Sequence, residues 1–113
     1  MKILLLDENL PAPLKFDFSD RFEVTTVHDR NWQSKKDDEL LRAISNEDID
    51  YLLTADRNLE FQQNISKFNL KLVVLFTYDN RYKTLQSKVP LIEQALLSFS
   101  ETDNILHIDL RNR

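Results

Sequence analysis

The chain contains neither glycine nor cysteine among its 113 residues. Without cysteine it can form no disulfide or thiolate zinc site, and without glycine it lacks the glycine-rich loops that hold nucleotide phosphates. It also has no apolar run near the ~20 residues that cross a bilayer. The apolar stretch 3–6 ends at Asp7, so the start does not resemble a signal peptide. These absences predict a cytoplasmic protein without membrane partners, whose chemistry depends on oxygen and nitrogen side chains.

Positive charge is in short supply, because 15 Lys and Arg face 19 Asp and Glu and leave a formal net charge of −4. A chain with this balance lacks the broad basic surface by which many proteins hold nucleic acid. A nucleic-acid role would therefore need a local group of cations or a bound metal ion. The candidates for a basic rim are Lys35, Lys36, Arg57, Lys71, Arg81 and Lys83. In the alternative interpretation these are ordinary solvated residues.

The apolar residues predict one folded domain, because a chain of 113 residues with 42% hydrophobic content has room for one core. We assign that domain to residues 1–113. Runs rich in Ile, Leu and Val predict five strands, at 3–6, 22–27, 51–54, 72–77 and 105–110. Helical spacing between them predicts four helices, at 10–17, 37–47, 57–66 and from Pro90 onward. Continuous apolar strands that alternate with helices predict an α/β fold, a three-layer sandwich around a mostly parallel five-stranded sheet.

Acidic residues follow the predicted strands at the positions where a parallel sheet binds its ligands, at the carboxyl ends of the strands. The first strand is followed by Asp7, Glu8 and Asn9, and the third by Asp56 and Asn58. If the strand order is 2-1-3-4-5, these two strands are neighbours about 4.8 Å apart, and one cation could reach both Asp7 and Asp56. A third acidic group, Asp37, Asp38 and Glu39, begins the helix after the second strand.

Carboxylates gathered at one edge repel one another unless a cation or a raised pKa relieves them. In a chain without cysteine, hard oxygen ligands favour Mg²⁺ or Mn²⁺. Such an ion can activate water and stabilise the leaving oxygen of a phosphodiester. The alternative interpretation is structural: acids at a helix start, such as Asp37 and Asp38, cap the helix and complement its dipole.

The same residues carry a resemblance to a known family. The strings ILLLDENLP, NWQSKKDDELLRA, LLTADRNLEFQQN, VVLFTYDNR and VPLIEQAL resemble the small, standalone PIN-like proteins. That family includes domains of unknown function and candidate toxins of bacterial toxin–antitoxin pairs, and the similarity covers about the whole chain. It implies a PIN-like fold, cleavage of RNA with Mg²⁺ or Mn²⁺, and an antitoxin as partner. A second copy of the chain is a further candidate partner.

The resemblance also implies site residues, carried over position by position. The implied metal ligands are Asp7, Glu8, Asp37, Glu39 and Asp56, and of these Asp7, Glu39 and Asp56 are the implied catalytic residues. The implied substrate-binding residues are Asn9, Asn58, Asn80 and Arg81, the last as a phosphate-binding guanidinium. The family's fourth acid has two candidates here, Glu60 and Asp79. The chain departs from its relatives at Asn31 and Ser34, where they commonly carry glycine, so the loop around Trp32 is expected to differ in shape.

Two other functions compete with the nuclease. An acid pair at Asp7 and Glu8, with Asp56 and Thr77 after later strands, also describes the Mg²⁺-assisted phosphoacceptor site of a receiver-like domain. The lysine that such a site needs after the fifth strand is missing, because Arg111 stands there instead. The third interpretation is an inactive PIN-like module that binds an antitoxin or another protein and cleaves nothing.

Overall fold

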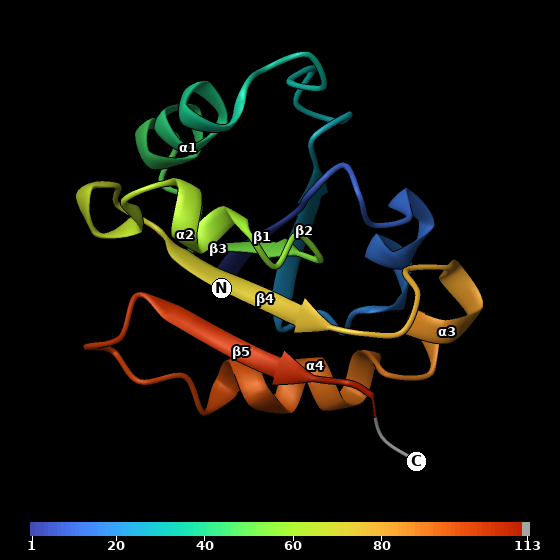
Figure 1. Ribbon diagram of the computed structural model, residues 1–113. Coiled ribbons are helices and arrows are strands. Elements are labelled where there is room, and N and C mark those ends of the chain that lie inside the picture. Colours follow the sequence, from blue (N-terminus) through green and yellow to red (C-terminus); the bar gives the residue numbers. More distant parts are fainter. Residues whose placement is uncertain (112–113) are drawn as a thin grey trace.

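A five-stranded sheet runs through the middle of the molecule, and all of its strands are parallel (Figure 1). The strands are β1 (Lys2–Leu6), β2 (Phe22–Thr26), β3 (Tyr51–Thr54), β4 (Lys71–Phe76) and β5 (Ile105–Asp109). Their order is β2-β1-β3-β4-β5, which makes β1 and β3 neighbours as the site prediction required. The computed structural model describes residues 1–111, so residues 112 and 113 of the predicted domain lie outside the described part.

Helices cover both faces of the sheet, which confirms the predicted α/β three-layer sandwich (Figure 1). One face carries α1 (Asp37–Asn46), α2 (Leu59–Gln62) and the 3₁₀ turn η2 (Ile65–Lys67). The other carries the 3₁₀ helix η1 (Ala12–Asp17), α3 (Tyr82–Gln86) and α4 (Val89–Leu97). Among residues 1–111 the longest helix, α1, has 10 residues, and none is long and apolar enough to span a membrane. The arrangement is compatible with the PIN-like fold that the resemblance implies.

The helix predictions need three corrections. The segment 57–66 is not one helix, because Gln63 takes an extended backbone (φ −129°, ψ 144°) that separates α2 from η2. In the segment 10–17 the helix covers Ala12–Asp17 and is a short 3₁₀ helix, not an α-helix. The predicted helices also omit α3, a helix of 5 residues in which Leu85 alone is buried.

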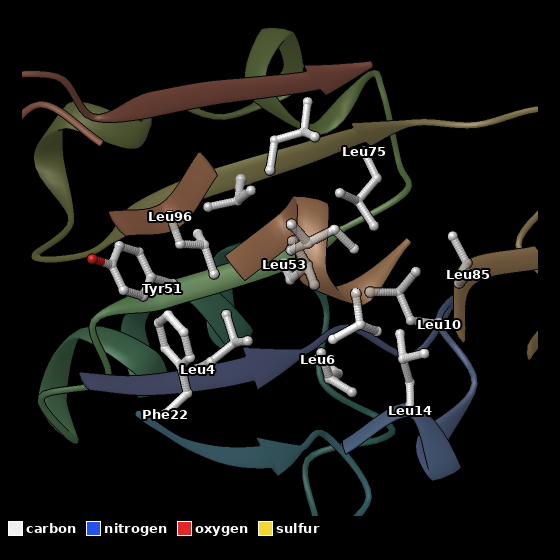
Figure 2. Close-up of a cluster of buried hydrophobic side chains, with 14 of the residues drawn as sticks. Leu4, Leu6, Leu10, Leu14, Phe22, Tyr51, Leu53, Leu75, Leu85 and Leu96 are labelled. Carbon is white, nitrogen blue, oxygen red and sulfur yellow. The ribbon is translucent and has the colours of Figure 1, made fainter. Parts of the chain in front are cut away.

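The central strands are buried on both faces, which explains their unbroken apolar runs. In β1, Leu4 and Leu6 lie in the core under α4, whereas Leu5 lies in the core under α1. Figure 2 shows the first of these cores, to which Leu53 of β3 and Leu96 of α4 both belong. The sheet edge that carries the acidic residues therefore rests on a scaffold packed from both sides.

Among residues 1–111, the two residues with a positive φ angle are an asparagine and an aspartate, which stand where glycine is commonly found. Asp48, just after α1, has a φ of 56° and ends that helix as glycine commonly does. Asn31 has a φ of 62°, a left-handed conformation that asparagine adopts more readily than most residues. Asn31 is a position where the resemblance led us to expect glycine, and its backbone has the left-handed conformation that glycine adopts readily.

Lys71 stands at the opposite edge of the sheet from the acids, at the start of β4. Its ammonium donates to the carbonyl oxygens of Ser100, Glu101 and Asp103 at 3.1, 3.2 and 2.5 Å. These contacts hold the loop between α4 and β5. The expectation that Lys71 belongs to a basic rim around the acids is therefore wrong.

Candidate functional site

The loops that follow β1 and β3 are joined at the carboxyl edge of the sheet. The backbone N–H of Asp7 donates to the carbonyl oxygen of Leu53 at 2.9 Å. Beyond it, the N–H of Ala55 donates to Oδ1 of Asn9 at 3.2 Å. The two segments that carry Asp7 and Asp56 thus lie together, as the strand order and the rule for parallel sheets predict.

The hydroxyl of Thr54, the last residue of β3, is the centre of this site. It donates to Oδ2 of Asp7 at 2.7 Å, and it accepts from Nδ2 of Asn9 at 3.2 Å and from the backbone N–H of Asp56 at 3.0 Å. One donated and two accepted hydrogen bonds satisfy a hydroxyl completely. Thr54 is fully buried, so its position and that of its partners are fixed by the fold. Thr54 stands at the predicted edge in the sequence, but no role was expected for it; the signal was a polar residue at the end of the buried strand YLLT.

Burial and neighbouring charges both act on the carboxyl group of Asp7. Its pKa is raised from the ordinary 3.8, first because burial disfavours the charged carboxylate. Hydrogen bonds from Thr54 and from the backbone N–H of Glu8 partly offset this, while the carboxylates of Asp37 and Asp56 raise the pKa further. Asp37 and Asp56 are therefore both near enough to repel the charge on Asp7. The loop after β1, the start of α1 and the loop after β3 act on one carboxyl group.

The raised pKa of Asp7 predicts how stability depends on pH. A carboxyl whose pKa is higher in the folded state than in the unfolded state destabilises the fold when it is ionised, and this penalty vanishes below the unfolded value of about 3.8. Asp7→Asn should therefore unfold at a higher urea concentration than the wild type near pH 7, and the difference should shrink as the pH falls toward 3.8. Urea titrations in chelator-treated buffers measure it, with Asp20→Asn as the control for loss of a distant exposed acid. A difference that does not change with pH would contradict the prediction.

The other acids of α1 divide between two roles. Oε1 of Glu39 accepts the backbone N–H of Lys36 at 3.0 Å and so caps the start of α1. Glu39, an implied catalytic residue, thus makes the capping hydrogen bond, while Asp37 and Asp38 also lie in the first turn of α1, where acids complement the helix dipole. Asp37, by contrast, acts on Asp7 through its charge. Glu8 is exposed, and its backbone N–H donates to Oδ1 of Asp7 at 2.8 Å.

The implied substrate-binding residues lie around this edge and differ in their hydrogen-bond partners. The backbone N–H of Asn58 donates to Oδ1 of Asp56 at 2.9 Å. Nδ2 of Asn80, in the loop after β4, donates to the carbonyl oxygen of Asn9 at 2.6 Å and ties a third loop to the site.

Arg81 pairs with Asp79, whose Oδ2 lies 3.3 Å from the guanidinium, and the arginine side chain is 82% exposed. Hydrogen bonds from the backbone and side chain of Arg81 lower the pKa of Asp79 to about 2. Asp79, one candidate for the fourth acid, is therefore engaged by its own loop. The other candidate, Glu60, is also engaged, because its Oε1 lies 2.5 Å from Nε2 of His107.

The donor set fits a hydrated hard cation and not an all-protein cage. Within residues 1–111, no three Asp, Glu or His side chains are grouped closely enough to hold a metal ion by themselves. Mg²⁺, however, commonly binds through one or two carboxylates and completes its shell with water and substrate phosphate. Asp7 and Asp56 offer carboxylates of this kind, and the charges that act most strongly on Asp7 are those of other acids. Asp7 and Asp56 are therefore the residues at this edge that could hold a Mg²⁺ or Mn²⁺ ion with water completing its shell.

Comparison of the chain with protein-family models, with curated proteins and with solved structures gives no match in any of the three.

Proposed function

We propose that the protein is a divalent-metal-dependent endoribonuclease of PIN-like type and the toxin component of a bacterial toxin–antitoxin pair. The observation that carries this proposal is the joining of two strand ends through Thr54, which leaves Asp7 half-buried beside the charges of Asp37 and Asp56. A site so short of positive charge suits a divalent cation. The reaction itself, cleavage of RNA, comes from the resemblance of the chain to PIN-like proteins.

Asp7, Asp56 and Asp37 would hold the ion, together with Glu8 and Glu39 if the resemblance applies at every position. When bound, the ion supplies a hydroxide-like water and stabilises the leaving oxygen of the phosphodiester. Asp7 is aimed by two hydrogen bonds, from the Thr54 hydroxyl and the Glu8 amide. Its orientation is therefore preorganised before any ligand arrives.

Asn9 and Asn80 are better suited to positioning than to direct contact with RNA. Both polar groups of the Asn9 side chain are engaged, with Thr54 and with Ala55. Asn80 in turn binds the Asn9 carbonyl oxygen. We propose that these residues hold the β1 loop in place, whereas Asn58 and Arg81 have side chains exposed to incoming RNA.

The test is an RNA digestion combined with a growth assay. We expect the purified wild type to fragment RNA with Mn²⁺, to lose this activity in EDTA, and to slow growth when it is induced. Asp56→Asn should do none of these, although its side-chain oxygen can still accept the Asn58 amide and keep the loop folded. Asp20→Asn, a distant exposed acid, should behave as the wild type. Intact RNA in ample Mn²⁺, without a Mn²⁺-induced rise in unfolding temperature, would favour the inactive protein-binding interpretation.

A receiver-like phosphoacceptor is the second candidate, favoured by the strand order 2-1-3-4-5 with Asp56 after the third strand. Two contacts speak against it. The Thr77 hydroxyl donates to the Asp79 carbonyl oxygen at 2.6 Å, and Arg111, after β5, forms an ion pair with Asp109. Incubation with acetyl phosphate and Mg²⁺ separates the two functions, since only a phosphoacceptor would gain an acid-stable, base-labile label that Asp56→Asn lacks.

A further inference from the structure

An arginine guanidinium lies over an aromatic ring beside the acidic site. Arg57 follows Asp56 directly, and its guanidinium carbon is 4.0 Å from the ring centre of Phe76. Phe76 ends β4, the strand next to β3, so this contact lies at the same carboxyl edge as Asp7 and Asp56. The guanidinium is thus fixed at the rim of the acidic loops.

The ring beneath Arg57 is itself held in place. The His107 imidazole lies 5.1 Å from it, centre to centre, and contacts Glu60 of α2 through Nε2. The Phe76 ring therefore packs against an imidazole of β5 that Glu60 of α2 holds in place. A planar cation stacked on a fixed ring loses little further freedom when it binds a ligand.

A second guanidinium approaches the same ring. The Arg111 carbon lies 5.5 Å from the centre of Phe76, and its nitrogens bind both oxygens of Asp109 at 3.0 Å. Arg111 is thereby neutralised. Arg57 is not, because no carboxylate within residues 1–111 lies at ion-pair distance from it. The unpaired guanidinium of Arg57, with its N–H donors available, is therefore the group at this ring that can bind an anion.

The chemistry of Arg57 suits a phosphate. A guanidinium carries its N–H groups in one plane as a fork, and this fork matches two oxygens of a phosphodiester. Arg57 is exposed and so accessible. Arg81, the arginine that the sequence suggested for this role, already shares its guanidinium with Asp79.

We propose that Arg57, held by Phe76 beside Asp56, binds a backbone phosphate of single-stranded RNA next to the phosphodiester that is cleaved. This inference rests on the proposed nuclease function and names the residue that recognises its substrate. It also explains how a chain with a net charge of −4 can bind RNA, since the needed cation is local.

The experiment measures RNA binding separately from cleavage. Fluorescence anisotropy with an end-labelled single-stranded RNA, in EDTA, gives the dissociation constant and its dependence on salt. We expect Arg57→Gln to weaken binding about tenfold and to lower the slope of log affinity against log salt by about 0.7, the value for one phosphate contact on a single strand. Arg57→Lys should fall between this variant and the wild type, because it keeps the charge but loses the planar fork.

The matched control is Arg21→Gln, which removes an exposed arginine next to the start of β2, at the opposite edge of the sheet. It should bind RNA as the wild type does. If the wild type cleaves RNA but Arg57→Gln binds and cleaves equally well, the inference fails and the nuclease function stands. If the wild type neither binds nor cleaves RNA, both fail. Circular dichroism confirms that each variant is folded.

Discussion

Replacing Asp7 by asparagine is expected to lower metal-dependent RNA cleavage about a hundredfold or more while the protein stays folded. Asp7 is the central carboxylate of the site. The Thr54 hydroxyl and the Glu8 amide donate hydrogen bonds to it and fix its orientation. The charges of Asp37 and Asp56 repel its own charge. Asparagine keeps the size and one oxygen of the side chain but supplies no negative charge to a cation. The initial rate of RNA cleavage in Mn²⁺ is the measurement.

The stability of the same variant separates a lost ligand from a lost fold. The substitution removes a half-buried charge, so Asp7→Asn should unfold at a temperature equal to or above that of the wild type in EDTA. In Mn²⁺ the order should reverse, because only the wild type gains stability by binding the ion. Full activity in Asp7→Asn would show that Asp7 has no part in the reaction.

Replacing Thr54 by valine should destabilise the protein by about 2–4 kcal/mol, because one hydroxyl satisfies three polar partners in a buried place. Valine has nearly the same shape and suits a strand, so the lost hydroxyl dominates the effect. Asn9 and the Asp56 amide would lose an acceptor, and Asp7 would lose its donor. Cleavage should fall with stability, since both acids lose their alignment. Urea unfolding and the RNA digestion measure the two effects.

Thr54→Ser is the control for the hydroxyl. It keeps all three hydrogen bonds and loses only a buried methyl group, at a cost of about 1 kcal/mol. It should therefore recover most of the activity that Thr54→Val loses. If the valine variant were as stable and active as the serine variant, the hydroxyl of Thr54 would not organise the site.

The placement of Asp7 and Asp56 at one edge of the sheet could be predicted because it follows from the arrangement of parallel strands. Each residue follows a buried strand, and the carboxyl ends of parallel strands share one edge. The strand order then made β1 and β3 neighbours, with Leu6 opposite Leu53. Placing both residues needed only the strand boundaries, which the apolar runs indicate well.

The roles of Thr54 and Glu39 could not be predicted in the same way. Thr54 binds Asp7 across 47 positions of the chain, a contact that exists only once β1 and β3 pair. Glu39 lies in an acidic run where capping and metal binding demand the same residue type, and only the structure shows that one of its oxygens caps α1. The residue type alone cannot show whether a carboxylate caps a helix or binds a metal ion.

By itself the sequence determined the layered α/β architecture, since uninterrupted apolar strands must be covered on both faces, and it determined that carboxylates would collect at one sheet edge. Only the tertiary structure decided which side chains aim those carboxylates, and which arginine keeps its donors free. The physical reason is how far apart in the sequence the interacting residues lie. Burial patterns follow from neighbours along the chain, whereas the Thr54 hydroxyl network and the stacking of Arg57 on Phe76 join residues that folding alone brings together.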